Sequence, residues 1–302
     1  MNDFGRADLR LDFCTDAARF LSLAERYLAA NPVVSTVVTS NAAQTLTRQR
    51  DGTAPPESDW WLVVTDQSGV VGAAMRTATS PPCPPFLLPM PDDAAVGLAR
   101  VLHERGEEVL GINGALPTVQ LCADELARLV GGRVDVAYHT RLHELRDLVQ
   151  PAAVPGELRL ATEGDVELAT EWFEAFLDDA DEQAGRQRGA AGHQATGPDE
   201  VLRRIRSHHL WFWVDESGDP VHLTGANPPA LGVARIGPVY TPPSQRGRGW
   251  ASNAVAGVSR QLQAAGARVC LYTDQANPTS NKIYAALGFA PVTDMANLLL
   301  AT

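Results

Sequence analysis

The sequence contains little cysteine and almost no lysine. Its four cysteines, Cys14, Cys83, Cys122 and Cys270, form no CxxC pair, and no histidines stand at metal-ligand spacing. Isolated thiols in a long chain are typical of a reducing compartment and argue against a disulfide framework. We therefore predict a cytoplasmic protein without a metal site.

Long apolar runs and an excess of positive charge are also missing. No stretch of about 20 apolar residues occurs, and the N-terminal MNDFGRADLRLDF lacks an apolar segment, so neither a membrane span nor a signal peptide is expected. Lys282 is the only lysine, and the formal net charge is −11. Because an acidic chain is poorly suited to nucleic acid or anionic lipid, we expect neither as a partner. The oligomeric state stays open between a monomer and a homodimer.

The composition is that of an ordinary globular protein, and the chain repeats its own pattern. Apolar residues make up 45% of the 302 residues, a length sufficient for two domains of about 150 residues each. DLRLDFCTDAARFLSLAERYLAANP, from Asp8, is matched by ELRLATEGDVELATEWFEAFLDDAD, from Glu157. Each stretch predicts a short strand followed by an amphipathic helix.

Further matched segments extend this repeat. WWLVVTDQSGVVGAAM and LWFWVDESGDPVHLTG both predict hairpins, and LPTVQLCADELARLVGG and NPTSNKIYAALGFAP both predict helices after a Pro-Thr pair. Both halves thus read as strand, helix, hairpin, long strand, helix, strand, helix, strand. We interpret this order as a duplication in the α/β class, with mixed α+β sheets in domains 1–150 and 156–302. The linker is expected near VQPAAVPG, residues 149–156.

The stretch SQRGRGWASNAV, residues 244–255, predicts either a solvated turn or a phosphate site. Gly247 and Gly249 lack a Cβ, and the first N–H groups of the helix expected from Trp250 have no partner within the helix. No GK[ST] follows the glycines, which excludes a P-loop. A dinucleotide fingerprint is a near miss: TPPSQ separates the strand from the glycines and Ser252 replaces the third glycine, although Asp274 stands where a ribose-binding acid is expected.

The segment NPTSNKIYAALGF predicts the last helix. Asn277 is a good N-cap and Gly288 a good stop signal. Ser280 and Tyr284 are four residues apart, so their side chains share one helix face. Tyr284 is either a packing residue with a solvated hydroxyl or a phenol that protonates a leaving group.

Together these two motifs resemble the GCN5-related N-acetyltransferase family. RGRGWA fits the acyl-CoA loop R/Q-x-x-G-x-G/A, as Arg246, Gly249 and Ala251, and NPTSNKIYAALGF fits the pattern Asn-x-x-Ser-x-x-x-Tyr-x-x-x-Gly-Phe. The resemblance covers roughly residues 157–300. The first half resembles a degenerate second copy, so the whole chain is similar to the tandem acetyltransferases.

The resemblance implies acetyl-CoA as co-substrate and direct transfer of the acetyl group to an amine. Val239, Tyr240 and Thr241 would pair their main chain with the pantetheine amides, and Tyr284 would protonate the thiolate as general acid. The pyrophosphate would bind the main-chain amides of Arg246, Gly247, Arg248, Gly249, Trp250 and Ala251, with Asn277 and Ser280 beside the cofactor.

The general base is harder to assign, because the strand GVARIGPVY carries no carboxylate. Glu171, Glu174, Asp178 and His222 are candidates, and we take Glu174 as the base. The acidic run from residue 163 to 182 is either a solvated helix face or an attraction for a cationic small-molecule amine, which we expect as acceptor. The polar loop at 184–198 is expected to order on substrate binding.

The first half lacks the corresponding residues. Leu116, Val119 and Ala123 stand where Asn277, Ser280 and Tyr284 stand in the second half, and PMPDDAAV places two aspartates at the helix start. We therefore predict that this half does not bind CoA. Two alternatives for the whole protein stay open: a non-catalytic CoA-binding or regulatory module, and a nucleotide-binding oxidoreductase.

Overall fold

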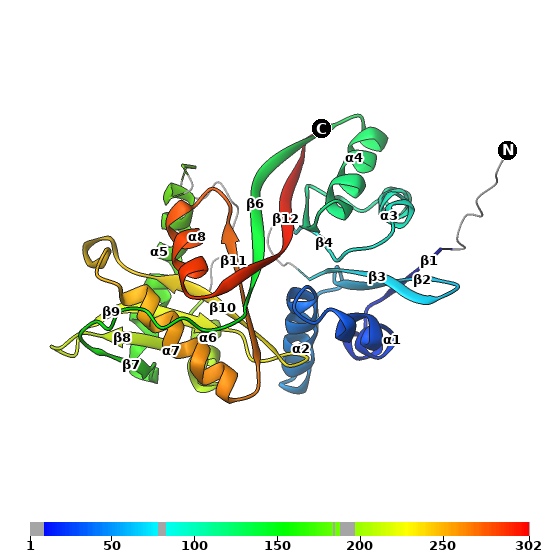
Figure 1. Ribbon diagram of the computed structural model, residues 1–302. Helices are drawn as coiled ribbons and strands as arrows, with labels where there is room; N and C mark the ends of the chain where they lie inside the picture. Colours follow the sequence, from blue (N-terminus) through cyan, green and yellow to red (C-terminus); the bar gives the residue numbers. More distant parts are fainter. Residues whose placement is uncertain (1–8, 78–82, 184, 188–196, 302) are drawn as a thin grey trace. The chain divides into compact units, whose positions relative to one another are not determined.

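The chain divides into two compact units. The computed structural model describes residues 9–77, 83–183, 185–187 and 197–301. Unit 1 comprises Met1–Thr140 with Thr293–Thr302, and unit 2 comprises Arg141–Val292 (Figure 1). The functional division into domains 1–150 and 156–302 stays a prediction. Within the described part, no helix is both long and apolar enough to cross a membrane.

Unit 1 is a sheet with two helices against each face. Its strand order runs β1-β2-β3-β4-β5 and continues through β12 to β6. Of the pairs within β1 to β5, only β4–β5 is parallel. The elements are β1 (Arg10–Cys14), α1 (Ala17–Ala30), α2 (Thr36–Arg50), β2 (Trp60–Asp66), β3 (Gly69–Arg76), β4 (Phe86–Leu87), α3 (Asp92–Glu104), β5 (Gly111–Ala115), α4 (Thr118–Val130) and β6 (Arg133–Leu145).

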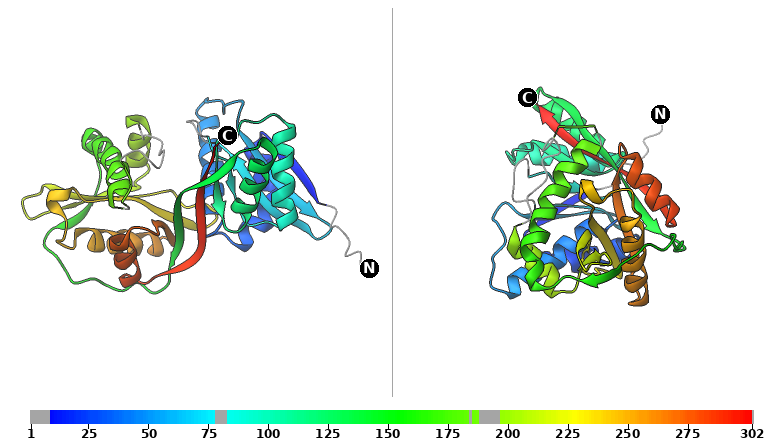
Figure 2. Two further views of the ribbon diagram at one scale, coloured as in Figure 1. Left: turned by 90° about the horizontal axis from the view of Figure 1, so that it is seen from above. Right: turned by 90° about the vertical axis from the view of Figure 1, so that its left-hand side faces the viewer.

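Unit 2 repeats this arrangement, with strand order β11-β10-β9-β8-β7 beside β6. Helices α5 and α6 cover one face of its sheet, and α7 and α8 cover the other (Figure 2, left). The elements are β7 (Glu157–Leu160), η1 (Glu163–Asp165), α5 (Val166–Gln183), α6 (Pro198–Arg206), β8 (Leu210–Val214), β9 (Pro220–Ala226), β10 (Val233–Tyr240), η2 (Pro243–Gln245), α7 (Trp250–Ala264), β11 (Arg268–Asp274) and α8 (Pro278–Ala286). Strand β12 (Phe289–Ala301) begins in unit 2, and its residues from Thr293 on belong to unit 1.

The order of helices and strands is the same along both halves of the chain. The predicted α/β class with a mixed sheet is confirmed. The predicted element order missed one helix in each half, α2 and α6, which follow α1 and α5. The β-branched TVV and the threonines of α2 have low helix propensity, so its sequence gives a weak helical signal.

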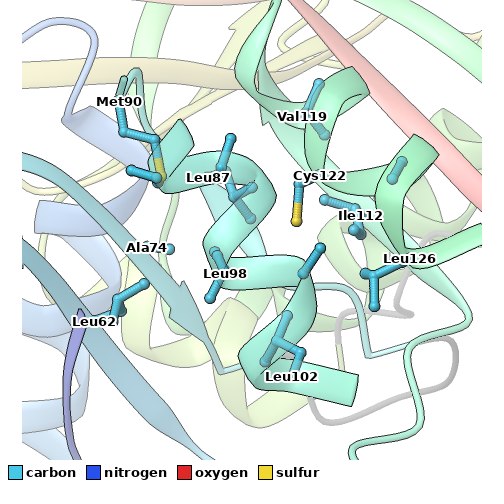
Figure 3. Packing of buried hydrophobic residues seen from close by; sticks show 14 of the residues in the cluster. Leu62, Ala74, Leu87, Met90, Leu98, Leu102, Ile112, Val119, Cys122 and Leu126 are labelled. Carbon is cyan, nitrogen blue, oxygen red and sulfur yellow. The ribbon is translucent and has the colours of Figure 1, made fainter. Parts of the chain in front are cut away.

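In unit 1, helices α3 and α4 close tightly on the sheet (Figure 3). Val119 and Ala123 of α4 are completely buried, and Val119 is the residue that the sequence aligns with Ser280. Strands β4 and β5 stay paired through Leu87 and Gly114, and a Cβ at Gly114 would lie 2.2 Å from the Leu87 carbonyl oxygen. Buried apolar side chains thus occupy the space between α3, α4 and the parallel strands β4 and β5.

The sheet of unit 2 has a separate apolar cluster on each face. Ile236 and Val255 belong to the cluster under α7 and α8. Trp172 and Phe212 belong to the cluster under α5, where their rings meet edge to face at 5.5 Å. Burying such side chains stabilises the fold by about 1.5–3 kcal/mol each. These clusters hold β10 and β11 firmly from both sides.

Candidate functional site

A cavity opens in unit 2 where two neighbouring parallel strands stop pairing. The ladder between β10 and β11 ends at Ile236 and Leu271, but the strands continue to Tyr240 and Asp274. On its other side β10 has a register shift between Ile236 and Val239, next to Pro238, which has no N–H to donate. The cavity between the separated strand ends has a volume of about 460 Å³.

All residues that the sequence assigns to the cofactor line this one cavity, together with the assigned general acid. They are Val239, Tyr240, Thr241, Arg246, Gly247, Arg248, Gly249, Trp250, Ala251, Asn277, Ser280 and Tyr284. They come from the end of β10, the following loop, the start of α7 and one face of α8. The roles of these residues stay predictions, but the structure brings them together.

The loop before α7 presents a row of main-chain donors to the cavity. Gly247 and Gly249 both have left-handed backbone conformations, with φ of +78° and +82°. Gly249 occupies the N-cap position without a side-chain cap. Within the described part of the chain, none of the main-chain N–H groups of residues 247–252 donates a hydrogen bond to another residue. Six donors at a helix start, where the helix dipole is positive, suit an anion.

The side chain of Arg246 turns away from this row of donors. Its Nε donates to the carbonyl oxygen of Thr241 at 3.0 Å, and its Nη2 donates to Asp179 of α5. The hydroxyl of Tyr240 is also hydrogen-bonded to Asp179. Burial and the negative charge of Asp179 raise the pKa of Tyr240. The charge of Arg246 is therefore compensated within the protein, and its main chain remains next to the cavity.

Helix α8 supplies the opposite wall of the cavity. The side-chain oxygen of Asn277 accepts from the main-chain N–H groups of Thr279 and Ser280, both at 3.1 Å, and so caps the helix as predicted. Tyr284 lies two turns from Asn277 and packs edge to face on Phe289, with ring centroids 5.9 Å apart. Burial raises the pKa of Tyr284, so its phenol stays protonated at neutral pH.

Comparison with known proteins agrees with this geometry. Residues 229–296 match the family model described as FR47-like protein. The chain is similar in structure to a GCN5-related N-acetyltransferase from Sphaerobacter thermophilus, with a TM-score of 0.61 and 17% identity over 96% of this chain and 94% of that one. The chain has the GCN5-related N-acetyltransferase fold. The resemblance inferred from the two motifs is confirmed.

Two further acetyltransferase-fold structures match over nearly their whole length. One is a GNAT-family acetyltransferase from Colwellia psychrerythraea, with a TM-score of 0.55 and 12% identity over 97% of this chain and 100% of that one. The other is a tandem GNAT protein from the clavulanic acid biosynthesis pathway, with a TM-score of 0.51 and 14% identity over 97% and 98%. A search among curated proteins finds no match. The family model thus covers the second half of unit 2, and the solved structures show the shared fold.

The residues considered as general base do not line the cavity of the acetyltransferase fold. Glu174 and Glu171 are exposed on α5. His222 is completely buried, with Nδ1 2.7 Å from the hydroxyl of Thr241 and Nε2 2.7 Å from that of Thr224. Burial lowers the pKa of His222 to about 3, so the imidazole is neutral and fully engaged. The geometry therefore gives no support to Glu174 as base.

Two carboxylates that the sequence did not assign to catalysis do line the cavity, Asp179 and Asp274. Asp274 ends β11 and pairs with Arg186 at 2.5 Å. Tyr272 stands two residues earlier on the same face of β11 and also lines the cavity. The spacing of two residues between Tyr272 and Asp274 puts both side chains on one face of the strand, and this is the signal that could have found them. No cluster of His, Cys, Asp and Glu suited to a metal is found among the described residues.

Proposed function

We propose that unit 2 transfers an acetyl group from acetyl-CoA to an amine. One observation carries the proposal: the six unpartnered N–H groups of residues 247–252 and the buried phenol of Tyr284 border the same cavity between the separated ends of β10 and β11. These features fit the two chemical ends of an acyl-CoA, a pyrophosphate and a thioester.

The fit of CoA is supported by the space as well as by the donors. A Cβ added at Gly247 would meet nothing within 4 Å, so the main chain there is open to a bulky anion. The N–H groups of residues 247–252 would hold the pyrophosphate. The separated edges of β10 and β11 offer main-chain groups of Val239 to Thr241 to the pantetheine amides. When bound, acetyl-CoA would supply an acetyl group as a thioester, with the CoA thiol as the leaving group.

Tyr284 acts as general acid in this proposal. The amine nitrogen bonds to the acyl carbon, the carbon–sulfur bond breaks, and the Tyr284 hydroxyl gives its proton to the thiolate. The amine loses a proton in the same reaction. Asp274 is better placed than Glu174 to receive it, because Asp274 lines the cavity and Glu174 faces solvent.

The proposal extends to the acceptor, the oligomeric state and the cellular location of the protein. The acceptor is an amine, the protein is a monomer or homodimer, and its location is cytoplasmic. The expected attraction of a cationic acceptor by the acidic run of α5 is weaker than the sequence suggests, because Asp179 and Asp181 are paired with arginines. Asp181 is completely buried.

Acetyl-CoA-dependent thiol release with a panel of amines tests the proposal. We expect release that depends on the amine and on the enzyme. Saturable CoA binding without release with any amine would instead favour the non-catalytic module. The oxidoreductase alternative has little support, because the sheet of unit 2 is mainly antiparallel and dinucleotide sites are built on parallel sheets.

A further inference from the structure

The face of the unit 2 sheet that α5 and α6 cover carries polar side chains without an assigned role. Arg235 of β10 lies directly beside Cys270 of β11. Tyr272 is two residues further along β11, so its side chain points to the same face. The neighbours Ile236 and Leu271 point to the opposite face, into the cluster under α7 and α8. Arg235 and Tyr272 therefore stand together on the face of the strands that points away from α7 and α8.

Both side chains have buried donors for which the described residues offer no partner. No described residue accepts a hydrogen bond from the buried Nη1 of Arg235 or from the buried hydroxyl of Tyr272. Among the described residues, no carboxylate pairs with Arg235 either. A buried guanidinium stays charged, and buried polar groups in native proteins are nearly always paired. The missing partner of these two donors is therefore an anion or a strong acceptor.

Positive charge is in excess around Arg235. Arg204 of α6 donates to the carbonyl oxygen of Gly237 at 3.1 Å and faces Glu200 at 3.4 Å. Burial lowers the pKa of Arg204, Glu200 opposes this fall, and the nearby charge of Arg235 adds to it. Glu200 already pairs with both Arg203 and Arg204, and no described carboxylate pairs with Arg235, so a negative charge beside Arg235 would be favourable.

Of the two residues with these buried donors, Tyr272 lines the cavity and Arg235 does not. Gly237 and Tyr272 both line the cavity between β10 and β11. A Cβ at Gly237 would meet nothing within 4 Å. A ligand in the cavity can therefore approach the sheet at the position next to Arg235.

A negatively charged side chain, that of Asp274, lines the same cavity. Asp274 follows Tyr272 by two residues on β11 and lines the cavity, with its side chain 15% exposed. Its Oδ1 accepts from the main-chain N–H of Ala276 at 2.8 Å, and its other oxygen faces Arg186. Residues two apart on a strand are about 6–7 Å apart. Arg235 pairs with Cys270, four residues before Asp274, so the main chains of Arg235 and Asp274 are about 14 Å apart, with Tyr272 between them.

We propose that the acceptor carries an anionic group as well as the amine, with its carboxylate or phosphate bound by Arg235 and Tyr272 and its ammonium directed to Asp274. This inference rests on the proposed transferase function and narrows the expectation of a purely cationic acceptor. Amino acids and amino-sugar phosphates have this chemistry, whereas polyamines do not.

Acetyl transfer to matched pairs of amines tests the inference. The pairs are the twenty amino acids against their C-terminal amides, and glucosamine 6-phosphate against glucosamine, with spermidine as a polyamine. We expect the best substrate to carry the anion, with kcat/KM about 10- to 100-fold above that of its uncharged partner. A best substrate without an anion overturns the inference and leaves the transferase function intact. No transfer to any amine overturns both.

Variants locate the anion site. Arg235→Gln and Tyr272→Phe are expected to reduce the preference for the anionic partner by about tenfold or more and to leave the KM for acetyl-CoA unchanged. Arg235→Lys should retain part of the preference. Arg206→Gln is the matched control, because Arg206 is exposed and pairs only with Glu163 in the described part. Thermal unfolding checks the fold of each variant, and Tyr272→Phe serves if Arg235→Gln does not fold. An unchanged preference in both folded variants overturns the assignment.

Discussion

The guanidinium of Arg246 is hydrogen-bonded to the carboxylate of Asp179, 67 residues earlier in the chain. This bond ties the loop before α7 to the last turns of α5, and both residues line the cavity. The carboxylate is only 9% exposed and the guanidinium is 37% exposed. The arginine of the acyl-CoA motif thus fixes the shape of the loop through its side chain while its main chain faces the cavity.

A double-mutant cycle with Asp179→Asn and Arg246→Gln measures this connection. We expect each single change to reduce the free energy of unfolding by about 1–2 kcal/mol, below the value for a fully buried pair because the arginine is partly exposed. The double variant should lose less than the sum of the two, as urea unfolding would show. Strictly additive losses would mean that the pair makes no contribution.

Tyr284→Phe should abolish most of the acetyl transfer. We expect kcat to fall by about 10²- to 10⁴-fold because the general acid is lost, with little change in the KM for acetyl-CoA. Burial raises the pKa of Tyr284, so the wild-type rate should not fall at high pH until well above pH 10, the ordinary value for tyrosine. Steady-state kinetics from pH 7 to 10 check both points. Tyr27→Phe in unit 1 is the control, and an equal loss of kcat there would remove the assignment of Tyr284.

Gly249→Ala should weaken acetyl-CoA binding. Gly249 has φ of +82°, and a Cβ there would lie 3.0 Å from Cγ1 of Val154. We expect the free energy of unfolding to fall by about 1–2 kcal/mol and the KM for acetyl-CoA to rise by about tenfold or more, because the helix start must shift.

Gly218→Ala is the matched control for this change. Gly218 lies in the β8–β9 turn with φ of +85° and has nothing within 4 Å of an added Cβ. It should lose similar stability through backbone strain with no effect on KM. Equal effects of the two variants on KM would contradict the proposed role of the loop.

His222→Asn should flatten the acid dependence of stability. The folded-state pKa of about 3 lies below the ordinary 6.5, so the unfolded chain binds a proton more readily between these values. Stability that is present at pH 7 is therefore lost as pH falls from 6.5 toward 3, with a slope of up to about 1.4 kcal/mol per pH unit. Urea unfolding at pH 7, 6, 5 and 4 should show this slope in the wild type and a smaller one in the variant. Equal slopes in the wild type and in His222→Asn would contradict this account of the histidine.

The fold could be predicted from the sequence because the signals that specify its helices and turns depend only on neighbouring residues. The N-cap Asn277, the glycines of the loop and the helical spacing of Ser280 and Tyr284 each depend on nearby residues, and all were recognisable. The second helix of each half was missed. Helix α6 is only nine residues long and follows the polar loop predicted at 184–198, most of which lies outside the described residues.

The charges of the site could not be predicted, because they depend on contacts between distant segments. Arg246 looked like a cation for phosphate until Asp179 was seen beside it. Glu174 and Asp179 are equally acidic in sequence, but a helix turns one to solvent and the other to the cavity. Likewise, Arg235 is an ordinary strand residue until the absence of a described partner becomes visible.

Amide hydrogen exchange with and without acetyl-CoA tests the central claim most directly. The N–H groups of residues 247–252 have no described acceptor, so they should exchange rapidly in the free protein and become protected when acetyl-CoA binds. Protection should include α8 from residue 277 to 284 and should be absent from α3 and α4 of unit 1. Protection at the start of α3 in unit 1, or unchanged exchange at 247–252 at saturating acetyl-CoA, would contradict the account.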